Sequence, residues 1–119
     1  MKSGKTGTTR IIHATGYSFS GLRAAWTHES AIRQEAILLL LGVPITFFLD
    51  VTKVEQMLMI GCLLLIIIVE LLNSAIEAVV DRVGSEYHEL SGRAKNIGSA
   101  AVFVTLCLAV FIWTFSILF

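Results

Sequence analysis

A row of polar side chains inside an otherwise apolar run is the part of this sequence best suited to chemistry. Its members, which we call the acidic stripe, are Glu70, Asn73, Glu77 and Asp81. They follow one another at intervals of three, four and four residues, so a helix would place them on one face, with Ser74 beside them. A carboxylate in hydrocarbon costs about 2.5–3.5 kcal/mol on insertion scales. The acidic stripe therefore requires partner groups, protons or cations.

The two glutamates of the acidic stripe could divide the work of a transfer reaction. Glu77 lies nearer the polar segment that follows, where it could hold Mg²⁺ together with nucleotide phosphates, because Mg²⁺ prefers oxygen ligands. Glu70 lies about 10 Å deeper along a helix axis, where it could act as a general base toward an alcohol. Alternatively, the stripe only joins helices by hydrogen bonds. We favour chemistry because amides and hydroxyls would join helices without the desolvation cost of a charge.

The polar segment after the acidic stripe is rich in side chains that can bind a nucleotide. It reads DRVGSEYHELSGRAKN, and its candidate contacts for phosphate, ribose and base are Glu86, Tyr87, His88, Glu89, Arg93 and Lys95. The pattern matches neither a Walker A loop nor the glycine-rich loop of protein kinases. On composition alone, nucleotide binding and an ordinary solvated loop are equally open.

The elements that would position these groups are membrane helices. Hydrophobic residues make up 55% of the 119 residues and the mean hydropathy is +0.80, which is more apolar surface than a soluble domain of this size could bury. Apolar runs predict transmembrane helices at about residues 31–49, 56–81 and 96–119 of a single domain, 1–119. We therefore expect an all-α membrane protein. Nine basic and nine acidic residues cancel, which argues against a nucleic-acid partner.

The distribution of basic residues predicts the orientation of the chain in the membrane. Most of them lie in residues 1–30 and 82–95, and only Lys53 lies between the first two predicted spans. The positive-inside rule therefore places the N-terminus and the 82–95 loop in the cytoplasm and the C-terminus in the periplasm. Residues 1–30 mix apolar and basic side chains, which predicts an amphipathic helix at the membrane surface, interrupted around Gly16 and Gly21.

The cysteines and histidines suggest no metal or redox site. Cys62 and Cys107 lie in apolar runs far apart in the sequence, without a CxxC motif. We predict that both are small buried hydrophobic residues rather than a disulfide or a metal pair. His13 and His28 lack metal-ligand spacing and are predicted to be ordinary interfacial residues.

Two stretches of the sequence resemble the prokaryotic diacylglycerol kinase family. The run VELLNSAIEAVVDRVGSEYHELSGRAKNIGSAA, Val69 to Ala101, resembles the family signature, and TRIIHATGYSFSGLRAAW followed by THESAIRQE resembles its surface helix and the entrance to its first span. The resemblance implies a homotrimer of three-span subunits with active sites at subunit interfaces. It also implies transfer of the γ-phosphoryl group of Mg·ATP to diacylglycerol in the bacterial inner membrane, giving phosphatidic acid for phospholipid recycling.

The resemblance assigns roles to individual residues. Glu70 would be the base that takes the proton from the primary hydroxyl of the lipid, with Asn73 supporting the geometry, and Glu29 and Glu77 would carry Mg²⁺. The residues implied to contact ATP are Arg10, Tyr17, Glu29, Glu77, Glu86, Tyr87, His88, Lys95 and Asn96. The residues implied to contact the lipid are Arg10, Tyr17, Trp26, Arg33, Glu35, Glu70 and Ser99.

Two other functions remain open at the level of the sequence. Small three-span kinases of similar layout phosphorylate undecaprenol, a polyprenyl alcohol, by the same chemistry. The longer surface helix and the SEYHELSGRAK run favour diacylglycerol. A non-enzymatic channel or structural subunit could instead use the acidic stripe to line an aqueous path, but that reading gives the basic and aromatic residues of the polar segment no role.

Overall fold

The computed structural model describes residues 6–84 and 88–119. Within these residues the chain is all-α and contains no strand, which confirms the prediction that the chain is helical throughout its regular structure. The helices are α1 (Gly7–His28), α2 (Ser30–Phe48), α3 (Lys53–Val83) and α4 (Glu89–Leu118). The nucleotide contacts predicted at Glu86 and Tyr87 lie outside the described residues.

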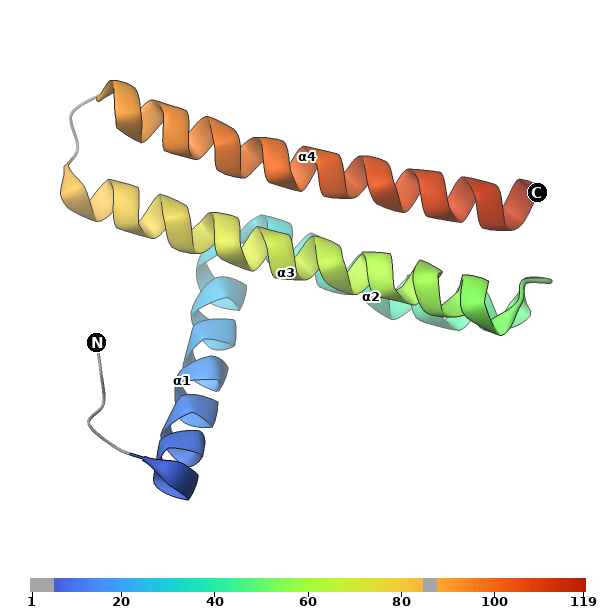
Figure 1. Cartoon of the computed structure of the whole chain (residues 1–119), viewed down its shortest axis with the longest axis horizontal. Coiled ribbons are helices and arrows are strands. Elements are labelled where there is room, and N and C mark those ends of the chain that lie inside the picture. Colours follow the sequence, from blue (N-terminus) through green and yellow to red (C-terminus); the bar gives the residue numbers. More distant parts are fainter. Residues whose placement is uncertain (1–5, 85–87) are drawn as a thin grey trace.

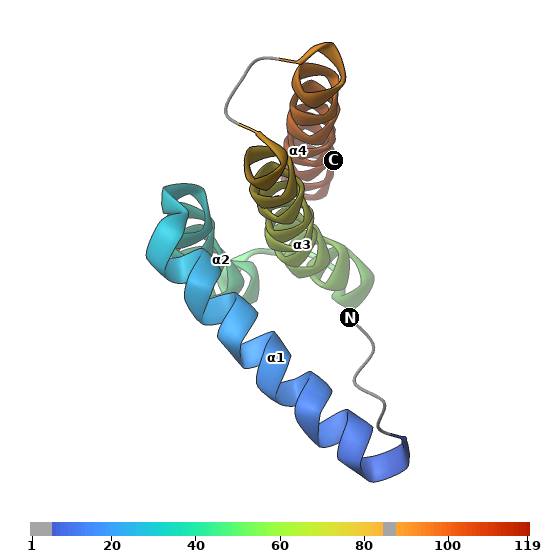
Figure 2. The same ribbon diagram turned by 90° about the vertical axis from the view of Figure 1, so that its left-hand side faces the viewer.

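Helices α2, α3 and α4 run side by side, and α1 runs across their direction (Figures 1 and 2). Helix α3 packs against both α2 and α4 and is therefore the central helix of the bundle. Helix α1 contacts α2 at the elbow between them and otherwise extends away from the bundle. The acidic stripe thus lies on the helix with the most neighbours.

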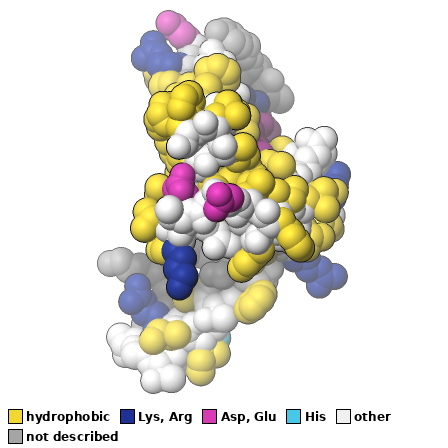
Figure 3. Space-filling model, turned by 90° about the vertical axis from the view of Figure 1, so that its right-hand side faces the viewer, with side chains coloured by type: hydrophobic (Ala, Val, Ile, Leu, Met, Phe, Trp, Pro, Cys, Tyr) yellow, Lys and Arg dark blue, Asp and Glu magenta, His cyan; other side chains and the backbone are white. Residues whose placement is uncertain are grey.

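Helices α2, α3 and α4 are each long and apolar enough to cross a membrane. Their outward faces carry large exposed hydrophobic side chains, such as Leu40, Phe47 and Phe103. Figure 3, viewed from the end where α2 turns into α3, shows hydrophobic side chains over much of the surface and few charged ones. Such a surface requires lipid or another apolar partner, because water would not solvate it.

The apolar core lies where α3 meets its two neighbours. Cys62, Leu63 and Ile66 of α3 are buried together with Ala109 of α4. Trp113 packs against this cluster, and its Nε1 donates a hydrogen bond to the Met59 carbonyl at 3.1 Å. Close helix packing and one long-range hydrogen bond therefore fix α4 against α3.

Three sequence predictions need correction. Helix α1 is continuous through Gly16 and Gly21, because a glycine lowers helix stability by only about 1 kcal/mol and does not remove the backbone hydrogen bond. The predicted 82–95 loop is largely helical, since α3 ends at Val83 and α4 begins at Glu89. Cys107 is exposed on α4 rather than buried, because its side of the helix is turned away from the apolar core. Both cysteines are free, as predicted.

Candidate active site on helix α3

The start of α3 is fixed by a capping box. Thr52 Oγ1 accepts a hydrogen bond from the Glu55 backbone N at 3.1 Å, and Glu55 Oε1 accepts one from the Thr52 backbone N at 2.9 Å. These bonds satisfy two backbone N–H groups that a helix N-terminus leaves unpaired. Gln56 Nε2 also donates to Thr46 Oγ1 of α2 at 3.1 Å. The rotation of α3, and with it the direction of the acidic stripe, is therefore set from its first turn.

Burial decreases along the acidic stripe toward the polar end of α3. Glu70 is 7% exposed and Asn73 is 8% exposed, whereas Glu77 is half-buried and Asp81 is exposed. Asn73 Nδ2 donates a hydrogen bond to Glu77 Oε1 at 2.8 Å. An amide that holds a carboxylate in one direction is an effective way to orient a cation ligand. The stripe thus joins a deep carboxylate to an oriented one nearer the surface.

Three other carboxylates lie within electrostatic range of Glu70. Glu77 lies on the same helix, and Glu29 and Glu35 come from the elbow and from α2; each is close enough to Glu70 for the like charges to repel. Together they would destabilise the site in an apolar environment unless protons or cations compensate their charge. The site is therefore suited to a cation with protein oxygen ligands.

The donor set fits magnesium that is shared with a nucleotide. Within residues 6–84 and 88–119, no group of three or more His, Cys, Asp or Glu side chains could form a closed metal site. Magnesium commonly takes only one or two protein carboxylates and completes its shell with water and phosphate oxygens. Glu77, oriented by Asn73, and Glu29 are the two carboxylates for which the sequence predicts this role.

An elbow between α1 and α2 positions Glu29. This residue has an extended backbone (φ −118°, ψ 107°) between the two helices. Arg33 Nη1 donates to the carbonyl of Trp26 at 2.6 Å and to that of Thr27 at 3.3 Å, so a cation of α2 caps the C-terminus of α1. Arg33 and Trp26, both predicted lipid contacts, therefore also fix the elbow.

A groove of about 650 Å³ separates the C-terminal half of α1 from α3. It is mostly apolar, and its polar members include Glu29 at the elbow and Ser74 of the acidic face. Ser74 Oγ is buried without a hydrogen-bond partner among the described residues. The groove therefore borders the acidic stripe at Ser74, while the rest of its lining on α3 is apolar.

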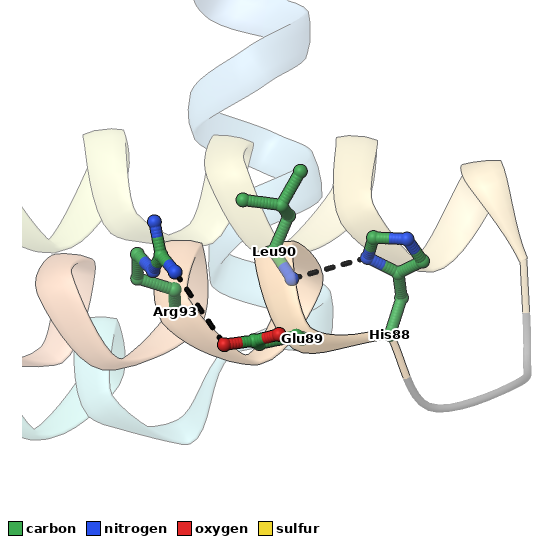
Figure 4. A network of polar contacts seen from close by, with 4 residues as sticks. All are labelled: His88, Glu89, Leu90 and Arg93. Carbon is green, nitrogen blue, oxygen red and sulfur yellow. Dashed lines mark hydrogen bonds and ion pairs between the residues drawn. The ribbon is translucent and has the colours of Figure 1, made fainter.

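The polar end of α4 is tied both to α3 and to its own first turn. Lys95 Nζ lies 2.7 Å from Asp81 Oδ1, which brings a predicted phosphate ligand to the end of the acidic stripe. Figure 4 shows His88 Nδ1 accepting a hydrogen bond from the Leu90 backbone N at 3.1 Å, and Arg93 paired with Glu89 at 3.6 Å. These contacts explain why a segment predicted as a loop is helical.

The structure brings some of the predicted site residues together and leaves others apart. Glu29, Glu35 and Glu77 lie within electrostatic range of Glu70, and Asn73 binds Glu77. By contrast, the exposed predicted ligands are not gathered there within one chain. These ligands are Asn96 and Ser99 on α4 and Arg10 and Tyr17 on α1. The N-terminal part of α1 points away from α3 (Figure 1).

Sequence reasoning missed one residue at the site, Gly98. It is buried on α4 against Asn73, and a Cβ there would collide with Asn73 Oδ1. Small residues mark close approach between membrane helices, so the glycine in the NIGSAA run could have identified this contact.

Residues 16–117 match the model of a family described as prokaryotic diacylglycerol kinase. The chain belongs to this family. It is 58% identical over 113 residues to the diacylglycerol kinase of Escherichia coli strain K12, covering 95% of this chain and 93% of that protein. It is 53% identical over 108 residues to the diacylglycerol kinase of Haemophilus influenzae, covering 91% and 92%. The diacylglycerol kinase of Helicobacter pylori strain J99 is 39% identical over 107 residues, covering 90% and 84%.

Membership of the family confirms the resemblance read from the sequence. The matched region includes α2, α3 and almost all of α4, and therefore the whole acidic stripe. It begins within α1, after Arg10. With three helices able to span a membrane, the chain is a multi-pass membrane protein of a bacterial lipid kinase family.

Proposed function

We propose that this protein phosphorylates 1,2-diacyl-sn-glycerol with Mg·ATP and produces phosphatidic acid and ADP. The observation that carries this proposal is the buried Glu70, one helical turn from an Asn73–Glu77 pair, on the central helix of a chain from this kinase family. The diacylglycerol kinases of Escherichia coli and Haemophilus influenzae are more than half identical to it.

In the proposed reaction, Glu70 is the general base. Its carboxylate takes the proton of the primary hydroxyl as the hydroxyl oxygen forms a bond to the γ-phosphorus. The bond between that phosphorus and the β–γ bridging oxygen breaks, and ADP leaves with the electron pair. Positioning and charge stabilisation supply most of the acceleration in such transfers, and general-base catalysis adds about 10²–10⁴-fold.

Glu77 and Glu29 are the proposed ligands of Mg²⁺, which would neutralise charge on the transferred phosphoryl group when bound. Asn73 keeps one Glu77 oxygen in a fixed direction through its 2.8 Å hydrogen bond. Lys95 adds a positive charge for phosphate and is held near the stripe by Asp81. Asn96, His88, Glu86 and Tyr87 complete the proposed nucleotide contacts.

Arg10 and Tyr17 are proposed to reach a nucleotide or lipid bound by a neighbouring subunit. In one chain the N-terminal part of α1 points away from the acidic stripe (Figure 2), so residues there need a second copy to meet it. The exposed apolar faces of α2, α3 and α4 could pack against such copies. We therefore propose a homotrimer with active sites between subunits.

The lipid is proposed to enter by the groove between α1 and α3. Its apolar walls suit acyl chains, and its polar end at Glu29 and Ser74 suits a hydroxyl headgroup directed toward Glu70. Trp26, Arg33, Glu35 and Ser99 are the other proposed lipid neighbours. Because α1 runs across the bundle, it would lie along the membrane plane if the bundle crosses the membrane.

The proposed location is the bacterial inner membrane. The N-terminus and the segment between α3 and α4 would face the cytoplasm, where ATP is available, and the C-terminus would face the periplasm. In this orientation Glu77, Asp81 and Lys95 lie at the cytoplasmic end of the bundle. By converting diacylglycerol into phosphatidic acid, the reaction would return the lipid to phospholipid synthesis.

The test of the proposal is transfer of labelled γ-phosphate from Mg·ATP to lipid by purified protein in mixed micelles. Diacylglycerol and undecaprenol are supplied side by side, with a reaction lacking magnesium as the control. We expect magnesium-dependent label in phosphatidic acid. Label confined to undecaprenyl phosphate would keep the mechanism and change the substrate. Folded protein that labels neither lipid would contradict the proposal and direct attention to ion conductance.

A further inference from the structure

Gly98 of α4 is buried at the point where α4 crosses the acidic stripe. A Cβ at this position would collide with Asn73 Oδ1 and lie 3.4 Å from Asn73 Cγ. The next nearest atom, Ile76 Cδ1, would be 3.9 Å away, which is an ordinary contact. The space that this glycine leaves open is therefore occupied specifically by the Asn73 amide.

The two ends of the Asn73 amide have different surroundings. Nδ2 donates to Glu77 Oε1 at 2.8 Å, whereas Oδ1 is buried without a hydrogen-bond partner among the described residues and faces Gly98. A carboxylate only accepts hydrogen bonds, so only the Nδ2 end of the amide can bind Glu77. The amide can therefore hold Glu77 only while its oxygen has room against α4.

Helix α4 cannot easily move away to make that room. Lys95, three residues before Gly98, is paired with Asp81 of α3 at 2.7 Å. Farther along, Trp113 donates to the Met59 carbonyl at 3.1 Å. The buried cluster around Trp113 therefore sets most of the separation of the two helices, and the exposed Lys95–Asp81 pair adds little. A larger side chain at position 98 would have to displace Asn73 instead.

We propose that Gly98 is a positioning residue for the magnesium ligand Glu77. By lacking a side chain, it lets the Asn73 oxygen pack against α4 so that the Asn73 nitrogen holds the Glu77 carboxylate. This inference rests on the proposed function, in which Glu77 binds Mg²⁺. It extends that function by assigning a role to a residue that touches neither substrate nor metal.

The test compares Gly98→Ala with the matched variant Gly61→Ala in full-length protein in micelles. Gly61 is an exposed glycine within α3, and a Cβ there meets no described atom within 4 Å. Binding of Mn²⁺, used in place of Mg²⁺, is measured by electron paramagnetic resonance with a non-hydrolysable ATP analogue. We expect Gly98→Ala to weaken Mn²⁺ binding about tenfold, as loss of a group that orients a metal ligand does. Gly61→Ala should bind like wild type.

A double-mutant cycle separates positioning from a general loss of packing. In an Asn73→Ala background, the atoms with which a Cβ at Gly98 would collide are gone. Asn73→Ala alone should weaken Mn²⁺ binding about tenfold, and adding Gly98→Ala should cause no further loss. Equal losses from Gly98→Ala in both backgrounds, or unchanged Mn²⁺ binding by Gly98→Ala in wild type, would overturn the inference.

The inference can still be tested if Gly98→Ala does not fold. If Gly98→Ala fails to fold but the double variant folds, the result supports the collision with Asn73. The Mn²⁺ affinity of Asn73→Ala then tests whether Asn73 positions Glu77. Wild-type Mn²⁺ affinity in Asn73→Ala would overturn the inference. The binding assay needs no lipid turnover. Wild-type protein that binds Mn²⁺ but phosphorylates no lipid would therefore contradict the proposed function, whereas wild-type activity with an unaffected Gly98→Ala variant would contradict only this inference.

Discussion

Each half of α3 packs against a glycine of a neighbouring helix, but the two contacts have different roles. In the apolar half, Gly42 of α2 lies against Leu63, and a Cβ there would be 2.7 Å from Leu63 Cδ1 and 3.6 Å from the Trp113 ring. In the polar half, Gly98 of α4 lies against the Asn73 amide, which holds Glu77. Both glycines allow helices to approach closely. Only the contact of Gly98 affects a proposed catalytic group, Glu77. We therefore expect alanine at Gly98 to weaken metal binding and alanine at Gly42 to lower stability alone.

The largest effect should come from the deepest carboxylate of the polar half. Glu70→Gln keeps the shape of the side chain but removes the base, so kcat should fall by about 10²–10⁴-fold while the half-saturating magnesium concentration stays unchanged. The measurement is the rate of lipid phosphorylation across a magnesium titration. Glu55→Gln is the matched control, because glutamine also completes a capping box at the start of α3. Near-normal kcat in Glu70→Gln would remove Glu70 from the role of base.

The next effect should separate Glu77 from Glu70 on the same helix. Glu77→Gln removes a proposed metal ligand, so we expect the magnesium concentration for half-maximal rate to rise about tenfold to a hundredfold. At saturating magnesium, the loss of kcat should be smaller than in Glu70→Gln. The same titration measures both quantities. An unchanged magnesium dependence would contradict the assignment of Glu77 and would also leave Asn73 without the partner that gives it a function.

A smaller effect, on stability alone, should come from the apolar half. Gly42→Ala forces Leu63 and its neighbours to shift, and overpacking of this kind costs about 1–3 kcal/mol. Thermal or denaturant unfolding in micelles measures the loss, with Gly61→Ala as the control. Activity per folded molecule and magnesium affinity should match wild type. Weakened magnesium affinity in Gly42→Ala would show that the two halves of α3 are not independent.

The smallest effect should come from the exposed end of the polar half. The Asp81 and Lys95 side chains are 65% and 43% exposed, so water and salt screen their attraction. Asp81→Asn should therefore lower the free energy of unfolding by less than Gly42→Ala does. The difference from wild type should shrink further at high salt, which unfolding curves at two ionic strengths would reveal. A loss as large as that of Gly42→Ala would mean that this ion pair fixes α4 more firmly than its exposure indicates.

The elements of this protein could be predicted from the sequence because their causes are local. The hydropathy of each apolar run predicts a helix long enough to span a membrane, and the structure has three such helices. The spacing of Glu70, Asn73 and Glu77 predicts that they share one face of a helix. The Asn73–Glu77 hydrogen bond is also local, since it joins residues four apart on one helix. Helix ends were harder to predict: the segment predicted as a loop after Asp81 is helical from Glu89, because the His88 cap and an early Glu89–Arg93 pair stabilise its first turn.

Only the tertiary structure decided which groups meet across helices. Glu35 lies near Glu70, Gly98 lies against Asn73, and Cys107 is exposed rather than buried. None of these follows from spacing within one helix, because each depends on how neighbouring helices are rotated and how closely they approach. Many weak side-chain contacts and a few specific bonds, such as that from Trp113 to the Met59 carbonyl, set that rotation together. The sequence thus determined the helices and the face that carries the chemistry, and packing between helices determined the surroundings in which that face acts.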